Sequence, residues 1–278
     1  MSELFRLSGA GNDFLALVEP ATAPSPETIR DWCRRGVSLG ADGVFVIRRE
    51  GGGDLVAMDY FNADGGWAAL CVNGTRCAAQ LAFHLGWPED ALTVRTGAGP
   101  FVARRLSNEE VELEMAPPET APRAVTLDVD GTEVRGWALV VGVPHAVIPW
   151  PEGLGTCPVG VLGPPIRRHP QLGTDGANAN FVRFAGPHEL EIRTWERGVE
   201  GETLACGSGV LAAVAVGIST GALELPVRAR TQGGFVLTVD GEAAGGGVTR
   251  WTMAGDARLL ARLETYPAAE RAFPETVW

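Results

Sequence analysis

The sequence lacks any long run of hydrophobic residues, although 45% of its 278 residues are hydrophobic. No apolar segment approaches the roughly 20 residues that a membrane-spanning helix needs. Residues 1–6 also lack the charged-then-apolar layout of a secretory signal peptide. We therefore expect no membrane partner and a cytoplasmic location, in which thiols stay reduced.

Positive charge is scarce as well. The chain has 23 Lys and Arg residues against 34 Asp and Glu residues, a formal net charge of −11. Such a surface repels phosphate groups, which argues against a nucleic-acid partner. The cysteines are odd in number, which without a secretory signal argues against a disulfide framework. They are Cys33, Cys71, Cys77, Cys157 and Cys206.

What the sequence does contain is a cysteine motif at residues 205–209 (ACGSG), followed by an apolar stretch at residues 210–218. Gly and Ser at a helix start leave the first backbone N–H groups open, and these donors form a site for an anion. The same position lowers the pKa of a cysteine and exposes its thiolate. The pattern predicts a reactive cysteine at the tip of a buried helix, beside a carboxylate or phosphate pocket.

The same arrangement occurs earlier in the chain. Residues 71–77 (CVNGTRC) open a second apolar helix, and Gly86 suits its C-terminus. An acidic, glycine-containing turn precedes each cysteine motif, at residues 61–66 and 196–202. Two such helices indicate two copies of one structural unit.

The segments that follow the two helices also match. Residues 94–102 resemble residues 229–236, and each segment is expected to be a strand. Thr96 follows the first cysteine at the same interval as Thr231 follows the second. Several matches in one order predict two equivalent halves, whose two cysteines meet at one cleft.

A proline-rich segment, residues 117–122, is the best domain boundary in the sequence. We expect a first domain at residues 1–118 that carries Cys71 and is joined by the tail, residues 264–278. The second domain is expected at residues 119–263 and carries Cys206.

The remaining local signals predict a strand-rich chain. Ser25 is expected to cap a short amphipathic helix at residues 28–35, and residues 142–145 are expected to end a strand. Asn12 and Asp13 are either turn residues or ligand contacts, and the turn alone favours the first. Strands are expected at residues 4–7, 14–18, 44–48, 55–61, 124–129, 132–135, 137–141 and 190–195, and residues 178–184 as a polar turn entering a strand.

Two thiols across a cleft suit one reaction in particular. A thiolate removes a proton from one face of a carbon, and a neutral thiol returns a proton to the opposite face, which inverts the stereocentre. The two thiols must then differ in protonation state, and the reaction runs in both directions. Backbone N–H groups at the helix tips would stabilise the charge that develops on a carboxylate next to that carbon.

The order of its motifs along the sequence makes the chain resemble the diaminopimelate epimerase family. The members of this family are cofactor-independent amino-acid epimerases of the lysine and cell-wall pathway. The resemblance implies an α/β (α+β) fold of two pseudo-symmetric domains, each a curled, mostly antiparallel β-sheet wrapped around a central helix. It also implies an amino-acid substrate, no cofactor, no metal and a homodimer. The motifs are residues 11–14 (GNDF), 61–65 (FNADG), 71–77, 144–145 (PH) and 196–209.

The resemblance also assigns roles. Cys71 and Cys206 would be the acid–base pair, and Arg197 would grip a carboxylate. His145 and Glu196 would tune the thiols, since a histidine near a thiol stabilises the thiolate. The substrate-binding residues would be Asn12, Asn62, Val72, Asn73, Asn178, Glu196, Arg197, Gly207 and Ser208.

Four positions depart from the family pattern. Val72 replaces a glycine after the first cysteine, and the backbone N–H remains. Val143 and Gly43 stand where the family often has a substrate-binding asparagine and glutamine, and Glu200 looks like an insertion. Because these changes affect mainly the distal end of the substrate, they bear on its identity more than on the reaction.

Four alternatives stay open at this point. The thiols could be structural, or Cys71 and Cys77 could bind a metal with His84, although their spacing fits no zinc pattern. The same thiol chemistry could act on another amino acid, as in proline, hydroxyproline or histidine racemases. The chain could also be a non-enzymatic thiol redox or binding module. If the thiols do lie opposite one another, oxidation should join Cys71 to Cys206 in an inactivating disulfide.

Overall fold

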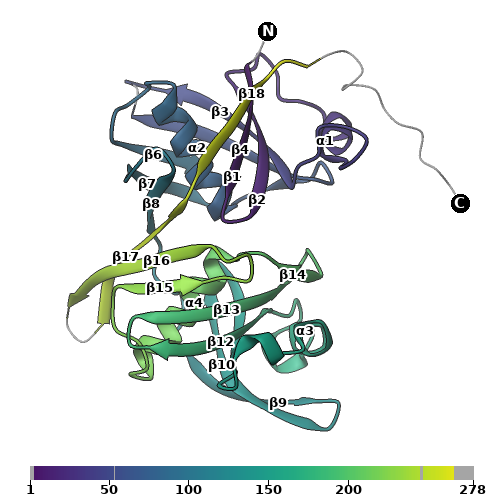
Figure 1. Ribbon diagram of the computed structural model, residues 1–278, viewed down its shortest axis with the longest axis vertical. Helices are drawn as coiled ribbons and strands as arrows, with labels where there is room; N and C mark the ends of the chain where they lie inside the picture. Colours follow the sequence, from purple (N-terminus) through teal and green to yellow (C-terminus); the bar gives the residue numbers. More distant parts are fainter. Residues whose placement is uncertain (1–2, 53, 245–246, 266–278) are drawn as a thin grey trace, which may run out of the picture. The chain divides into compact units, whose positions relative to one another are not determined.

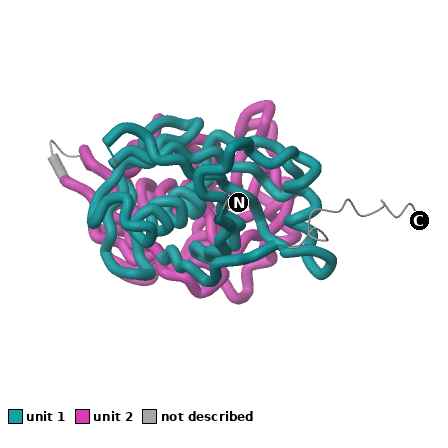
Figure 2. The backbone as a smooth tube through the Cα atoms, turned by 90° about the horizontal axis from the view of Figure 1, so that it is seen from above, with its two compact units in different colours: residues 1–113, 256–278 teal, residues 114–255 magenta. Residues whose placement is uncertain are grey.

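The computed structural model describes residues 3–52, 54–244 and 247–265. These residues form two compact units (Figure 2), one running to Leu113 and resuming at Asp256, the other spanning Glu114–Gly255. The chain therefore passes from the first unit to the second after Leu113 and returns after Gly255. The sequence analysis expected these boundaries slightly later, at residues 117–122 and at residue 264. Residues 266–278 of the expected tail lie outside the described residues. In the described part of the chain, no helix has the length and apolarity to cross a membrane.

The first unit is one β-sheet with two helices (Figure 1). Neighbouring strands run in the order β18-β1-β2-β3-β4-β6-β7-β8, with β5 paired to β4. Of the described pairings, β2–β3 and β4–β6 are parallel and the others antiparallel. The elements are β1 (Glu3–Gly9), β2 (Asn12–Val18), α1 (Pro26–Cys33), β3 (Gly43–Glu50), β4 (Leu55–Asn62), β5 (Trp67–Ala68), α2 (Val72–His84), β6 (Ala91–Thr96), β7 (Gly99–Arg105), β8 (Glu110–Met115) and β18 (Arg258–Leu263).

The second unit repeats this plan. Its strands run in the order β9-β10-β11-β12-β13-β15-β16-β17, with β14 paired to β13 and parallel pairs at β11–β12 and β13–β15. The elements are β9 (Arg123–Val129), β10 (Thr132–Val141), β11 (Val143–Pro149), η1 (Leu154–Thr156), α3 (Val159–Arg167), η2 (Pro170–Leu172), β12 (Asn178–Gly186), β13 (Glu189–Glu196), β14 (Gly201–Thr203), α4 (Gly207–Ser219), β15 (Val227–Arg230), β16 (Val236–Ala244) and β17 (Gly247–Asp256).

The two units match element by element. Each has its parallel pairs at the same places in the strand order, and α2 and α4 occupy the same place between strands. Both helices are buried over most of their length, because residues 72–83 and 209–217 are small or apolar with few exceptions. Each helix contacts several strands of its own sheet, which curls around it. The predicted fold, two pseudo-symmetric sheets each wrapped around a central helix, is confirmed.

Several local predictions were wrong. Residues 94–102 and 229–236 are not single strands, because glycine-containing turns divide them into the hairpins β6–β7 and β15–β16. Residues 132–135 and 137–141 form one strand, β10, through Gly136, whose backbone approaches the Val147 carbonyl too closely for a side chain.

Several elements were not predicted from the sequence, and two of them, β11 and α3, show why. Strand β10 ends at Val141, as expected, but Gly142, with φ at 68°, turns the chain directly into a further strand, β11, that was not expected. Helix α3 contains Pro164 and Pro165, which argue against a helix. It forms nonetheless because Val159 and Ile166 are buried in the core of the second unit, while Gly163 allows the helix to approach Trp195.

Candidate active site

Cys71 lies at the N-terminus of α2, as its motif predicted. It is the N-cap residue, and its sulfur accepts a hydrogen bond from the Gly74 N–H at 3.4 Å. Its carbonyl accepts hydrogen bonds from the Thr75 N–H at 2.8 Å and hydroxyl at 2.9 Å. The side chain is partly exposed. The thiol is therefore held against the open N–H groups of the first helical turn.

A chain of hydrogen bonds fixes the residues next to Cys71. Asn12 donates to Asp42 at 3.1 Å and accepts from the Asn73 side chain at 2.8 Å. Asn73 in turn accepts from the fully buried Arg76 at 2.6 Å. The two predicted residues Asn12 and Asn73 are thus brought together, and the β1–β2 turn is tied to the first turn of α2.

Cys206 occupies the same position on α4 but has different surroundings. It is the N-cap residue and only 8% exposed. Ser208 Oγ lies 3.6 Å and Asn178 Nδ2 lies 4.0 Å from its sulfur. Burial raises the pKa of this thiol well above its usual range, and the nearby Glu196 raises it further, against hydrogen bonds from Ser208 and the Gly209 N–H. The expected exposed and acidified thiolate is therefore wrong for Cys206, because burial outweighs the helix N-terminus.

Glu196, Arg197 and Asn178 form one cluster beside Cys206. Asn178 Oδ1 accepts a hydrogen bond from the Arg197 backbone N–H at 2.8 Å. The Thr203 hydroxyl donates to Glu196, whose pKa is raised by burial. The structure thus brings the predicted residues of the second unit together, with Asn178 linking the Arg197 backbone to the thiol.

His145 lies inside β11 and is fully buried. Its Nδ1 is 3.1 Å from Asn180 Nδ2, and burial lowers its pKa to about 4. The imidazole is therefore neutral at pH 7 and has no positive charge with which to stabilise a thiolate. That His145 tunes a thiol stays a prediction. Asn180 is a residue that the sequence analysis missed. It also donates to the Ala146 carbonyl at 2.9 Å and accepts from Thr194 at 3.0 Å.

The strand registers show which residues of the two units correspond. Gly43 pairs with Phe14 and Asn62 in the first unit, and Asn178 pairs with His145 and lies opposite the end of β13 in the second. Gly43 is therefore equivalent to Asn178, Asn62 to Glu196, and Asn12 to Val143. Asn62 ends β4 with an exposed side chain. Two of the departures from the family pattern, Gly43 and Val143, thus lie at strand ends next to a cysteine helix.

The sequence analysis also missed Tyr60. A Cβ atom added to Gly43 would lie 2.7 Å from Tyr60 Oη, so the tyrosine fills the space that a side chain at position 43 would need. Burial raises the pKa of Tyr60 above the usual range, and the nearby Cys71 thiol raises it further. Its place two residues before Asn62 on the same strand was the signal in the sequence.

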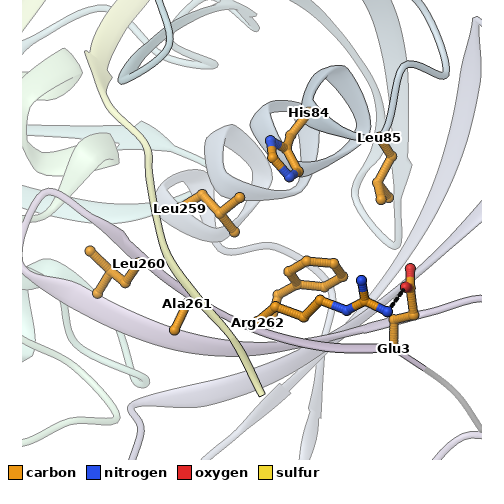
Figure 3. A pocket seen from close by; sticks show the side chains of 8 residues that line it. Glu3, His84, Leu85, Leu259, Leu260, Ala261 and Arg262 are labelled. Atoms are coloured by element: carbon orange, nitrogen blue, oxygen red, sulfur yellow. Dashed lines mark ion pairs between the residues drawn. The ribbon is translucent and has the colours of Figure 1, made fainter. Parts of the chain in front are cut away.

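A pocket of about 330 Å³ lies elsewhere in the first unit (Figure 3). It is at the C-terminal end of α2, whereas Cys71 is at the N-terminal end, and Glu3 and Arg262 form an ion pair at its rim. No predicted site residue lines it. The lining residues are Glu3, Phe5, His84, Leu85, Leu259, Leu260, Ala261 and Arg262.

A second pocket, of about 440 Å³, lies in the second unit. Pro144 and His145 belong to its lining. Within the described ranges, no group of three or more His, Cys, Asp or Glu residues is arranged to hold a metal ion.

The sequence matches the diaminopimelate epimerase family at residues 5–121 and 137–259. A diaminopimelate epimerase of Aquifex aeolicus (strain VF5) is 35% identical over 251 residues, which cover 86% of this chain and 89% of the relative. A diaminopimelate epimerase of Methanothrix thermoacetophila is 38% identical, with coverage of 84% and 86%.

Solved structures with lower sequence identity share the fold. A phenazine biosynthesis PhzC/PhzF protein from Clostridium difficile has a TM-score of 0.72 at 14% identity, covering 96% of this chain and 100% of that one. A hydroxyproline epimerase from Agrobacterium vitis has a TM-score of 0.67 at 16% identity, covering 99% and 96%. The family match and the relatives at 35% and 38% identity show that the chain belongs to the diaminopimelate epimerase family.

Proposed function

We propose that this chain is a diaminopimelate epimerase, an isomerase that interconverts L,L- and meso-2,6-diaminopimelate in the synthesis of lysine and peptidoglycan precursors. The observation that carries the proposal is the repeated motif. Each of the two equivalent units holds one cysteine as the N-cap of a buried central helix, in a chain that matches this family over most of its length.

In the proposed reaction, Cys71 and Cys206 act on opposite faces of the α carbon. The thiolate of one removes the α proton, and the thiol of the other delivers a proton from the other side. The helix N-termini supply the backbone N–H groups of Val72, Asn73 and Gly207, and Ser208 adds its own. These donors hold the α-carboxylate and stabilise the negative charge that develops next to it.

The remaining predicted residues would hold the distal amino-acid end of the substrate. Asn12 and Asn62 would do so from the first unit, and Asn178, Glu196 and Arg197 from the second. Arg197 is suited to a carboxylate, because a guanidinium binds two oxygens at once. The fixed carboxamides of Asn12 and Asn178 supply neutral donors and acceptors for the rest.

Several further properties belong to the same proposal. The thiols perform the proton transfers themselves, so the reaction needs no pyridoxal phosphate and no metal. The two described units would be the two epimerase domains. The enzyme would work in the cytoplasm, where its thiols stay reduced, and as a homodimer. Neither a nucleic acid nor a membrane takes part.

A second candidate is the same epimerisation on a different amino acid. Gly43 and Val143 favour it, because each lies at a strand end where the equivalent residue of the other unit is an asparagine, and neither offers a polar side chain for the distal end of diaminopimelate. A smaller substrate, such as proline, hydroxyproline or histidine, has no distal amino-acid end that polar side chains at these positions would have to bind.

A substrate panel decides between the candidates. Purified protein is incubated separately with L,L-diaminopimelate, meso-diaminopimelate, L-proline, trans-4-hydroxy-L-proline and L-histidine, and stereoisomers are resolved by chiral chromatography. We expect the first two to interconvert and the others to stay unchanged. Epimerisation of another amino acid with diaminopimelate left intact would refute the substrate, and no epimerisation at all would favour a binding or redox role.

A further inference from the structure

Tyr60 lies beside Cys71 and has no role in the proposed reaction above. It is 8% exposed and packs edge-to-face on Phe14, with ring centroids 6.1 Å apart. Its hydroxyl lies near enough to the Cys71 thiol for the two groups to influence each other's ionisation, and the thiol raises the pKa of the phenol. Met58, two residues earlier on the same face of β4, reaches the space beside Gly74 in the first turn of α2. This face of β4 therefore points at the helix tip that carries the thiol.

Gly43 makes room for the tyrosine. A Cβ atom at this position would lie 2.7 Å from Oη and Cε2 of Tyr60 and 2.7 Å from the Phe61 carbonyl oxygen. These distances are shorter than van der Waals contacts allow. Gly43 has no unusual backbone conformation that would by itself require glycine. The present position of Tyr60 and a side chain at position 43 therefore exclude each other.

The second unit has no phenol at the equivalent position next to its cysteine; the hydroxyl beside Cys206 is that of Ser208, 3.6 Å from the sulfur, on the helix itself. The position equivalent to Tyr60 is Thr194, which pairs with Asn180 as Tyr60 pairs with Phe45. The Thr194 hydroxyl donates to Asn180 at 3.0 Å and not to Cys206. Cys206 has the carboxyl group of Glu196 as its neighbour instead. A hydrogen-bond donor beside Cys71 and an acid beside Cys206 act in opposite directions on the two thiolates.

We propose that Tyr60 is a further catalytic residue, which donates its phenolic hydrogen to the Cys71 thiolate and makes Cys71, rather than Cys206, the thiolate of the free enzyme. The inference rests on the proposed function, in which the Cys71 sulfur is a reacting atom. Burial keeps the phenol neutral, because it raises the pKa of Tyr60, so the donor persists at neutral pH. A hydrogen bond to the charged form of a group favours that form.

Other ionisable groups act on this pair and are left in place by a change at Tyr60. They are Arg76 and Cys77 on α2, Asp42 before β3 and Cys33 on α1. The buried Arg76 favours the thiolate through its positive charge, and the carboxylate of Asp42 opposes it. The thiols of Cys33 and Cys77 stay neutral near pH 7, because burial raises the pKa of each. Removing the Tyr60 hydroxyl alone therefore isolates its contribution to the pKa of the Cys71 thiol.

The test measures the pH midpoint of Cys71 alkylation by iodoacetamide, with each cysteine followed separately by peptide mass spectrometry. Tyr60→Phe keeps the ring packed on Phe14. We expect it to raise the Cys71 midpoint by about one pH unit, which slows alkylation about tenfold at pH values below both midpoints. Gly43→Ala, which pushes the hydroxyl aside, should shift the midpoint in the same direction. Thr194→Val, the equivalent hydroxyl deletion in the second unit, is the matched control and should leave it unchanged.

Alkylation does not require turnover, so the two proposals fail separately. A folded Tyr60→Phe protein whose Cys71 midpoint stays within about 0.2 pH unit of wild type would overturn the role of Tyr60. An equal shift in Thr194→Val would overturn it too, because the effect would then not be local. A shift confined to Tyr60→Phe and Gly43→Ala in a protein that epimerises nothing would leave the hydrogen bond intact and remove only the proposed function.

Discussion

Cys71 and Cys206 occupy equivalent helix tips, yet their surroundings differ. Cys71 is partly exposed and has a phenol beside it, whereas Cys206 is buried next to a carboxyl group. Proton transfer in two directions needs one thiolate and one thiol, and dissimilar surroundings favour that difference. In the proposed reaction, equivalent positions in a repeated fold would therefore carry different protonation states.

Replacing either of these cysteines with alanine should lower epimerase kcat/KM by about a thousandfold or more, because each supplies one proton transfer. Cys157→Ala is the matched control, since that thiol is also buried in the second unit and burial raises its pKa to about 11. The control should retain near wild-type activity. A Cys71→Ala or Cys206→Ala protein with full activity would show that the thiols act outside catalysis.

His145 should make stability depend on pH. Its folded pKa, about 4, is below the ordinary value of 6.5. Between these values the unfolded chain binds a proton that the folded chain does not, so the free energy of unfolding falls as pH falls below 6.5. Relative to pH 7.5, wild type should lose about 2 kcal/mol more than His145→Gln at pH 5 in urea titrations. Parallel pH profiles for the two proteins would contradict the neutral buried imidazole.

At the scale of the element, the first turn of α2 depends on the side chain of Asn73. It accepts from Arg76 and donates to Asn12, and all three groups lose water when the unit folds. Asn73→Ala leaves the buried guanidinium without this partner. We expect a loss of about 2–3 kcal/mol in the free energy of unfolding, measured by urea denaturation. Asn108→Ala, at an exposed asparagine bonded to Arg105, should change it by less than about 0.5 kcal/mol. If both substitutions lowered the free energy of unfolding equally, the stabilising role of the buried hydrogen bonds of Asn73 would be contradicted.

The central helices could be predicted because their signals are local. A cysteine, small residues and a run of apolar residues define both α2 and α4, and the repetition of the pattern indicated the repeated unit. Elements held by distant contacts could not be predicted in this way. Helix α3 contains two prolines and is stabilised by a core from other parts of the second unit. Strand β11 follows a turn at Gly142 that looks like a strand end.

The residues of the candidate site also divide into those with a local sequence signal and those that depend on distant contacts. Motif residues such as Asn12, Asn73 and Asn178 were found from the sequence, and the structure brings each to the cysteine of its own unit. The neutral state of His145 and the raised pKa of Cys206 could not be predicted from the sequence, because both follow from burial, which a sequence motif does not reveal. Tyr60 was missed since its contact with Cys71 depends on the space at Gly43.

At the scale of the whole molecule, the proposed reaction requires that thiols from both units act on one carbon. Mild oxidation with diamide should then join Cys71 to Cys206 and abolish activity, and dithiothreitol should restore it. Peptide mapping should find the Cys71–Cys206 linkage in the inactive protein. Inactive oxidised protein in which both thiols remain free would contradict this prediction.

The most direct test of the two-thiol account follows deuterium from heavy water during the first few per cent of conversion of L,L-diaminopimelate. If one thiol removes the α proton and the other delivers a solvent-derived deuteron, the meso product should carry one α deuterium while the recovered L,L substrate carries almost none. Deuterium appearing equally in substrate and product from the start would contradict the account, because a single base would then serve both faces of the carbon.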